Sequence, residues 1–283
     1  MRIRAGFDIT FDTDPNTPLT LLLSVHPSRR ADLVTSDALT TSPSVPVRQH
    51  VDMFGNLASR ILAPAGIIRV TSDFTIHDCG LPEPHDWNAI QHPIDELPGN
   101  ALPYLLGSRY CETDRMCDLA WSLFGDEPAG WPRLQAILDY AHKRIRFGYE
   151  HARCTRTAWE AHEEQVGVCR DYAHLALTLC RCMNIPARYC TGYLGDIGVP
   201  PVDAPMDFSA WFEVYLGGRW HTVDARHNAR RVGRIVVARG RDATDVAIST
   251  AFGRAKLVGF NVLTEETLEG PSAARDAMVL AAE

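Results

Sequence analysis

Two adjacent glycines, Gly217 and Gly218, separate two short runs of strand-forming residues and constrain the fold more than any other feature. The runs cover residues 209–216 and 219–224, and a two-residue loop of this kind joins the strands of a tight β-hairpin. Such a loop fixes the register, because residues pair outward from the turn and directly opposed residues share a face. One face of the predicted hairpin is apolar, and the other carries two tryptophans, a tyrosine and two carboxylates.

The polar face of this hairpin brings together residue types that suit covalent catalysis. In the predicted register Ser209 lies diagonal to Asp224 on that face, within reach of long side chains. A histidine at position 209 would hydrogen-bond the carboxylate with one ring nitrogen and offer the other to a thiol. This chain has serine instead, and the strand histidine His221 falls on the apolar face, where we expect it to be packed.

Cys169 is the candidate thiol. It follows a glycine-marked turn and precedes small and apolar residues that recur at helical spacing until an Asn-Ile-Pro segment at 184–186 ends the pattern. The pattern predicts that Cys169 lies at or near a helix N-terminus, where free backbone N–H groups and the helix dipole stabilise a thiolate. The alternative interpretation is a buried cysteine that packs as a small hydrophobic residue.

Another histidine could act as the base in place of residue 209. His227 follows Asp224 closely and is the best substitute, although a regular strand would point it to the opposite face. This role therefore requires the chain to turn after Asp224. His174 lies about 140° around the helix from Cys169, so it does not share the face of the thiol.

Residues 1–100 and 101–283 are predicted to form two units. The first contains short alternating apolar runs between turn-rich segments, which is typical of a small sandwich or barrel-like sheet. A proline-rich crossing at 77–110 leads to two helical patterns that precede Cys169. After the hairpin, apolar runs at 234–238 and 256–263 are expected to extend the sheet of the second unit.

Composition narrows the expected location and partners. A formal net charge of −7 gives little support to nucleic acid or an anionic membrane as a partner. The N-terminus has no apolar signal segment, and no window reaches the roughly 18 apolar residues of a membrane helix, so we expect a cytoplasmic protein. Its 8 cysteines are then reduced, and because their spacing does not match a zinc site, we expect no metal or other cofactor. No pattern specifies an oligomeric state.

A basic stretch begins just after the hairpin. Its members are Arg226, Arg230, Arg231, Arg234, Arg239 and Arg241. The simpler interpretation is that these are solvated side chains paired with nearby acids. The functional interpretation is a surface for an acidic ligand or partner.

Four motifs make the chain resemble the transglutaminase-like, papain-like cysteine enzymes of bacteria. They are GVCRDYAHL at 167–175, IPARYCTGY at 185–193, SAWFEVY at 209–215 and WHTVD at 220–224. The resemblance implies an α+β fold, in which the cysteine-bearing helix packs on an antiparallel sheet and an N-terminal β-sandwich-like domain precedes this core. It also implies a catalytic cysteine at Cys169, a histidine on the first hairpin strand and an aspartate at Asp224. The histidine position falls on Ser209, and serine cannot act as the base for a thiol near neutral pH.

Two functional hypotheses follow from these residues. In the first, the protein is a cysteine protease or amidase, or a transferase, that forms a thioester between Cys169 and the acyl group of a peptide or protein amide. In the second, it is a catalytically inactive binding or scaffold protein, because Ser209 replaces the base. Tyr193, Trp211 and Trp220 are predicted to line a substrate cleft, and the alternative is that these aromatic residues pack in the core.

Overall fold

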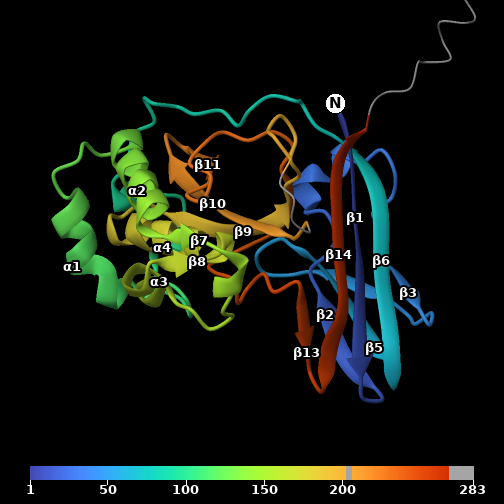
Figure 1. The fold of residues 1–283 in the computed structure, drawn as a ribbon. Helices are drawn as coiled ribbons and strands as arrows, with labels where there is room; N and C mark the ends of the chain where they lie inside the picture. Colours follow the sequence, from blue (N-terminus) through green and yellow to red (C-terminus); the bar gives the residue numbers. More distant parts are fainter. Residues whose placement is uncertain (202–205, 268–283) are drawn as a thin grey trace, which may run out of the picture.

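The computed structural model describes residues 1–201 and 206–267, and it has the mixed α and β architecture with antiparallel sheets that the sequence predicts. A helical part lies beside a β-rich part, with the strands β1 (Arg2–Thr13), β6 (Gly66–His77) and β14 (Ala255–Thr267) on the far side from the helices (Figure 1). The proline-rich segment after β6 crosses from one part to the other and carries two 3-10 turns but no strand.

One antiparallel sheet forms the centre of the helical part. Its strand order is β11-β10-β9-β12, and the strands are β9 (Ala187–Tyr193), β10 (Ser209–Leu216), β11 (Arg219–Val223) and β12 (Ile235–Gly240). The helices are α1 (Thr113–Phe124), α2 (Trp131–Arg144), α3 (Ala158–Glu164) and α4 (Cys169–Cys182). Short elements near them are β7 (Arg146–Phe147), β8 (Val166–Gly167), η2 (Ile94–Glu96), η3 (Leu102–Leu105) and η4 (Tyr149–His151).

The hairpin has the predicted register. Leu216 pairs with Arg219 and Glu213 pairs with Thr222 across β10 and β11. Gly217 and Gly218 both have positive φ, 57° and 79°, as the tightest two-residue hairpin turns require. The second strand ends at Val223, one position earlier than expected, and a turn follows it.

Helix α4 is the central helix of this part. Every residue from Asp171 to Cys182 is buried, as expected for a helix surrounded by packed elements. It packs against β9 and β10 on one side and against the other three helices elsewhere. At its start the Asp171 carboxylate accepts the Val168 N–H at 2.9 Å and pairs with Arg156 at 3.1 Å. These contacts fix the first turn of the helix and hence the position of Cys169.

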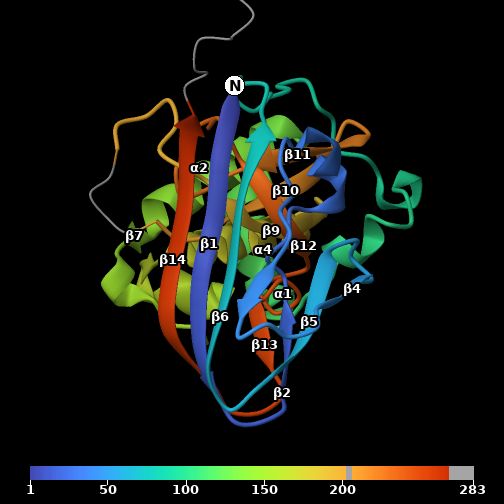
Figure 2. The ribbon, with the colours of Figure 1, turned by 90° about the vertical axis from the view of Figure 1, so that its right-hand side faces the viewer.

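Two four-stranded sheets make up the β-rich part, and Figure 2 turns β14, β1 and β6 of the first sheet toward the viewer. One has the order β14-β1-β6-β3, and the other has the order β13-β2-β5-β4. Their strands are β1 (Arg2–Thr13), β2 (Thr17–Leu21), β3 (Thr40–Ser42), β4 (Arg48–Val51), β5 (Leu57–Ala63), β6 (Gly66–His77), β13 (Ser249–Ala251) and β14 (Ala255–Thr267), and the 3-10 helix η1 (Pro27–Asp32) also belongs here. Buried and exposed residues alternate along β6, so one face of the sheet forms a core.

The C-terminal strands correct the expected organisation. The run at 234–238 extends the hairpin sheet as predicted, because β12 pairs with β9. The run at 256–263 does not, since β14 pairs with β1 along its whole length. Residues 249–267 therefore complete the N-terminal sheets, and the two parts do not divide at residue 100 as 1–100 and 101–283. Alternation of apolar residues predicts a strand but not which distant strand it joins.

Among the described residues, none of the helices combines the length and the apolar character needed to cross a membrane.

Candidate active site

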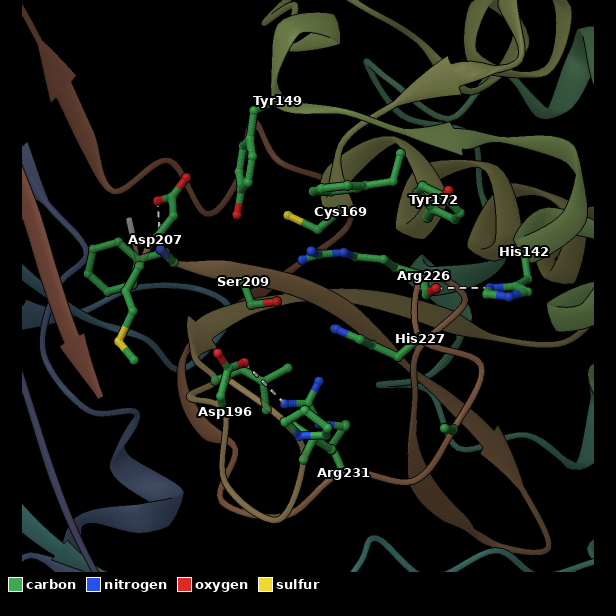
Figure 3. A pocket seen from close by; sticks show the side chains of 17 residues that line it. His142, Tyr149, Cys169, Tyr172, Asp196, Asp207, Ser209, Arg226, His227 and Arg231 are labelled. Atoms are coloured by element: carbon green, nitrogen blue, oxygen red, sulfur yellow. Dashed lines mark hydrogen bonds and ion pairs between the residues drawn. The ribbon is translucent and has the colours of Figure 1, made fainter. Parts of the chain in front are cut away.

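A cavity of about 540 Å³ contains Cys169, Ser209 and His227 in its wall (Figure 3). Cys169 is the first residue of α4, and Ser209 is the first residue of β10. His227 lies in the turn that follows β11. Three segments that are distant in sequence thus bring a thiol, a hydroxyl and an imidazole to one hollow.

Cys169 is half-buried at the N-terminus of α4. Burial raises the pKa of its thiol to about 11, and the Arg226 guanidinium and a hydrogen bond from the Ala210 N–H oppose that rise. The sequence predicted the opposite tendency, because a helix N-terminus favours a thiolate. Desolvation outweighs these favourable contacts here, so the thiol keeps its proton at neutral pH in the free protein.

His227 is bound to Asp224 through a short polar turn. Its Nδ1 lies 2.8 Å from Oδ2 of Asp224. Oδ1 of the same carboxylate accepts the backbone N–H groups of Arg226 at 2.8 Å and of His227 at 3.1 Å. Asn228 has a positive φ of 46° and donates its N–H to the Asp224 carbonyl at 2.9 Å.

Because of this turn, strand alternation does not decide which side of the hairpin His227 faces. Because the strand ends at Val223, His227 no longer follows the alternation of faces and reaches the polar side of the hairpin. The signal in the sequence is the Asp224 to Asn228 segment itself, since Asp and Asn favour turns closed by their own side chains.

Asp224 is held in its charged form. It is 5% exposed, and Arg234 donates to its Oδ2 at 2.6 Å. Burial opposes ionisation, but Arg234 and His227 outweigh it and hold the pKa of Asp224 below its ordinary value. Arg234 in turn pairs with Glu83 from the crossing segment. The carboxylate can therefore orient the His227 ring with Nδ1–H toward it and leave Nε2 free to accept a proton.

The resting arrangement of the three cavity residues is open. In the described part of the chain no hydrogen bond joins the Cys169 sulfur to His227 or to Ser209. Ser209 is 7% exposed, and its Oγ has no hydrogen-bond partner among the described residues. The position of the expected histidine is thus occupied by a small, unpaired hydroxyl.

The three predicted aromatic residues lie outside this cavity. Trp211 and Tyr193 are 2% and 0% exposed and belong to the packed interior. Trp220 packs edge-on against Tyr104, with ring centroids 5.4 Å apart. On a β-strand, alternation places an aromatic residue on one face but does not say which packing layer covers that face. The cavity is lined by other aromatic residues, namely Phe147, Tyr149, Tyr172 and Phe208.

The other histidines near the motifs have structural contacts. His221 is 3% exposed, and its Nε2 donates to the Leu216 carbonyl at 3.1 Å, so it is packed as predicted. His174 is fully buried, and its Nε2 accepts the Ala243 N–H at 3.2 Å. Neither residue lines the cavity. Across residues 1–201 and 206–267, no group of three or more His, Cys, Asp or Glu side chains is arranged to hold a metal ion.

The chain resembles known proteins in sequence and in fold. Residues 120–225 match the transglutaminase-like superfamily. The chain is similar to a crystal structure described as a "Putative Cysteine Protease" from Cytophaga hutchinsonii, with a TM-score of 0.80, 28% identity, and coverage of 96% of this chain and 93% of the other. It is also 39% identical over 87 residues to an uncharacterized protein of Mycobacterium leprae (strain TN), a match that spans 29% of this chain and 30% of the relative.

The chain therefore has a transglutaminase-like fold, and the sequence match to that superfamily lies in residues 120–225. The likeness to the Cytophaga hutchinsonii structure extends over both the helical and the β-rich part, since it covers nearly the whole chain.

Proposed function

We propose that this protein is a thiol-dependent acyl-transfer enzyme that acts on an amide bond of a peptide or protein. Cys169 is the nucleophile, His227 is the general base, and Asp224 orients His227. The observation that carries the proposal is the 2.8 Å contact between His227 Nδ1 and Asp224 Oδ2 in a cavity that also contains Cys169. A nucleophile, a base and an orienting carboxylate define this class of catalysis, whatever their order in the chain.

The first chemical step is attack by the Cys169 sulfur on the substrate carbonyl carbon. His227 Nε2 takes the thiol proton, because Nδ1 is engaged with Asp224. Because burial raises the pKa of the thiol to about 11, little thiolate is present at rest. The proton therefore moves to His227 as the sulfur attacks. Because no hydrogen bond joins the sulfur to His227 in the described residues, this transfer requires a bridging water or a rotation of the Cys169 side chain toward the imidazole.

The later steps use the same groups. The N-terminus of α4, with the Cys169 backbone N–H, stabilises the negative charge on the carbonyl oxygen of the tetrahedral intermediate. The His227 imidazolium then gives its proton to the leaving amine as the carbon–nitrogen bond breaks, and a thioester remains on Cys169. Water releases a carboxylic acid from this thioester, whereas an amine releases a new amide.

Mass spectrometry tests the covalent step directly. We expect wild-type protein, mixed with an alanine-rich peptide panel and quenched in acid, to carry an acyl group on the tryptic fragment that contains Cys169. Cys169→Ala should lack the adduct and all peptide turnover, while the matched variant Cys79→Ala, at an exposed cysteine outside the cavity, should keep both. Equal turnover by wild type and Cys169→Ala would reject the proposal.

A catalytically inactive binding protein is the second candidate, and Ser209 favours it. The unpaired Ser209 hydroxyl stands where the resemblance implies a histidine, and no hydrogen bond joins Cys169 to His227 in the described residues. This candidate predicts no turnover by wild type and a gain of hydrolysis in Ser209→His. Turnover by wild type that Ser209→His leaves unchanged or lowers would exclude it.

A further inference from the structure

Four arginines of the basic stretch after the hairpin form ion pairs, and two, Arg226 and Arg230, form none with the residues that the structure describes. The paired members are Arg231 with Asp196 at 3.9 Å, Arg234 with Asp224 at 2.6 Å, Arg239 with Glu213 at 3.0 Å and Arg241 with Asp245 at 2.8 Å. Arg230 is exposed and lies outside the cavity. The guanidinium of Arg226 has neither a hydrogen bond nor an ion pair with any residue that the structure describes.

Arg226 is nevertheless held in place. Its guanidinium carbon lies 3.8 Å from the centroid of the Phe147 ring, and its carbonyl accepts a hydrogen bond from His142 Nδ1 at 2.9 Å. Its backbone N–H donates a hydrogen bond to Oδ1 of Asp224 at 2.8 Å. Because Arg226 lines the cavity and its guanidinium has no anionic partner among the described residues, its planar hydrogen-bond donors are available to a ligand there.

That open space is the one beside the nucleophile. Arg226, Cys169 and Ser209 line the same cavity, and in Figure 3 the guanidinium end of Arg226 lies between the Cys169 sulfur and the Ser209 hydroxyl in the view shown. The influence of Arg226 on the Cys169 thiol also indicates that the two are close. A group bound by Arg226 therefore lies next to the reacting carbonyl.

Ser209 supplies a second, independent indication of a ligand. Its hydroxyl is more than nine-tenths buried, lines the cavity and has no partner among the described residues. Buried polar groups in native proteins are almost always hydrogen-bonded to protein, water or ligand. A guanidinium and a hydroxyl that face one hollow offer several donors, which matches the oxygens of a carboxylate.

The other charged groups of the cavity wall favour a ligand with a single carboxylate near Arg226, because the further arginine, Arg231, already pairs with Asp196. Asp196 and Asp207 also line the wall, and Asp196 lies 3.9 Å from Arg231. Asp207 accepts the Phe208 N–H at 2.6 Å, and burial raises the pKa of its carboxyl. A polyanionic substrate would meet these two carboxylates, and like charges repel each other in a partly desolvated site.

We propose that Arg226, with Ser209, binds a carboxylate that the substrate carries next to the scissile amide. The proposal rests on the proposed acyl-transfer function, which defines the scissile bond, and it adds the substrate class: acidic peptides or peptides with a free C-terminus near the cleaved bond. Both sources present the same group to Arg226.

The test measures binding in a protein that cannot turn over. Isothermal titration uses the full chain with Cys169→Ala and the acetylated tetra-alanine peptide as free acid and as amide, together with four glutamate-substituted amides and their four glutamine matches. The free-acid and glutamate arms separate a terminal from a side-chain carboxylate. We expect at least one acidic peptide to bind about 10- to 100-fold more tightly than its neutral match.

Variants assign that preference to the cavity. Arg226→Gln should remove it, Arg226→Lys should retain part of it because the charge stays but the planar fork is lost, and Ser209→Ala should weaken it several-fold. The matched control Arg230→Gln should leave it unchanged. Equal affinity for acidic and neutral peptides, or a preference that survives Arg226→Gln, would overturn the inference.

The outcome is separate from that of the proposed function. An acid preference that depends on Arg226 supports the inference even if wild-type protein shows no turnover, a result that would remove only the acyl-transfer proposal. Turnover of peptides together with equal affinity for acidic and neutral peptides would remove this inference and leave the acyl-transfer proposal standing.

Discussion

The β-rich part and the helical part each contain an arginine–aspartate ion pair, one exposed to water and the other buried. On the outer sheet Arg4 pairs with Asp73 at 2.6 Å, with side chains 45% and 57% exposed. At the site Arg234 pairs with Asp224 at the same 2.6 Å, with side chains only 6% and 2% exposed. The geometry of the contact is alike, and the difference lies in the access of water.

The exposure of each ion pair to water decides how much it contributes to the stability of the fold. Water and salt screen an exposed pair, and holding two long side chains together costs entropy, so its net effect on stability is small. A buried pair has little net advantage over apolar residues, but removal of one partner leaves an uncompensated charge in a poorly solvated place. The buried pair at the site therefore positions Asp224, and through it His227, more than it stabilises the fold.

The largest effect should come from the base itself. We expect His227→Asn to lower the turnover of a peptide substrate by about 10²- to 10⁴-fold, because the Cys169 proton loses its acceptor. The measurement is kcat on purified protein. His50→Asn, at an exposed histidine of β4 in the β-rich part, is the matched control and should leave kcat unchanged. Equal kcat for wild type and His227→Asn would assign the base to another group.

The reactivity of Cys169 should show how burial disfavours a thiolate that has no ion-pair partner. Since burial raises the pKa of this thiol to about 11, its alkylation by iodoacetamide in the free protein should accelerate about tenfold per pH unit from pH 7 toward pH 10. The rate is followed by mass of the Cys169 fragment. A plateau already reached near pH 7 would show that a thiolate is present at rest.

Loss of the buried cation should be the largest change in stability. Arg234→Gln leaves Asp224 and Glu83 without their shared partner and should reduce the free energy of unfolding by about 3–5 kcal/mol. Urea denaturation measures this change. A reduction well below 1 kcal/mol would mean that water reaches Asp224 once Arg234 is gone, contrary to its 5% exposure.

Acid should weaken the site through Asp224. Its pKa in the folded protein lies below its ordinary value of 3.8, so its contribution is fully present above that value and is lost as the pH falls through the lower, folded pKa. We expect the unfolding free energy of wild type to fall below about pH 4, and Asp224→Asn to show a shallower fall. Identical acid slopes for the two proteins would contradict the depressed pKa.

The smallest effect is expected at the exposed pair. Arg4→Gln breaks its contacts with Asp73 and with Glu265, yet water replaces both, so the urea midpoint should not move measurably. The experiment is run beside Arg234→Gln under the same conditions. A loss comparable to that of Arg234→Gln would remove the distinction between the two parts of the molecule.

Part of the site was predictable because it depends on local structure. A helix begins at Cys169 as its flanking turn and apolar spacing indicate, and the Gly217-Gly218 loop gives the hairpin the register predicted from sequence alone. The placement of His227 was not predictable from strand alternation, because the strand ends at Val223 and the chain turns around the Asp224 carboxylate. The pKa of Cys169 also went against the local expectation, since desolvation comes from elements far away in the chain.

The sequence by itself determined those features that neighbouring residues control: where the helix of Cys169 begins and how the hairpin pairs. Only the tertiary structure decided that β14 closes the N-terminal sheet by pairing with β1, that Arg234 is buried between Asp224 and Glu83, and that Arg226 lines the cavity without an anionic partner among the described residues. The physical reason is that backbone propensity and turn geometry act over a few residues. Burial and charge pairing instead depend on which distant surfaces meet, and alternation along one strand carries no record of that choice.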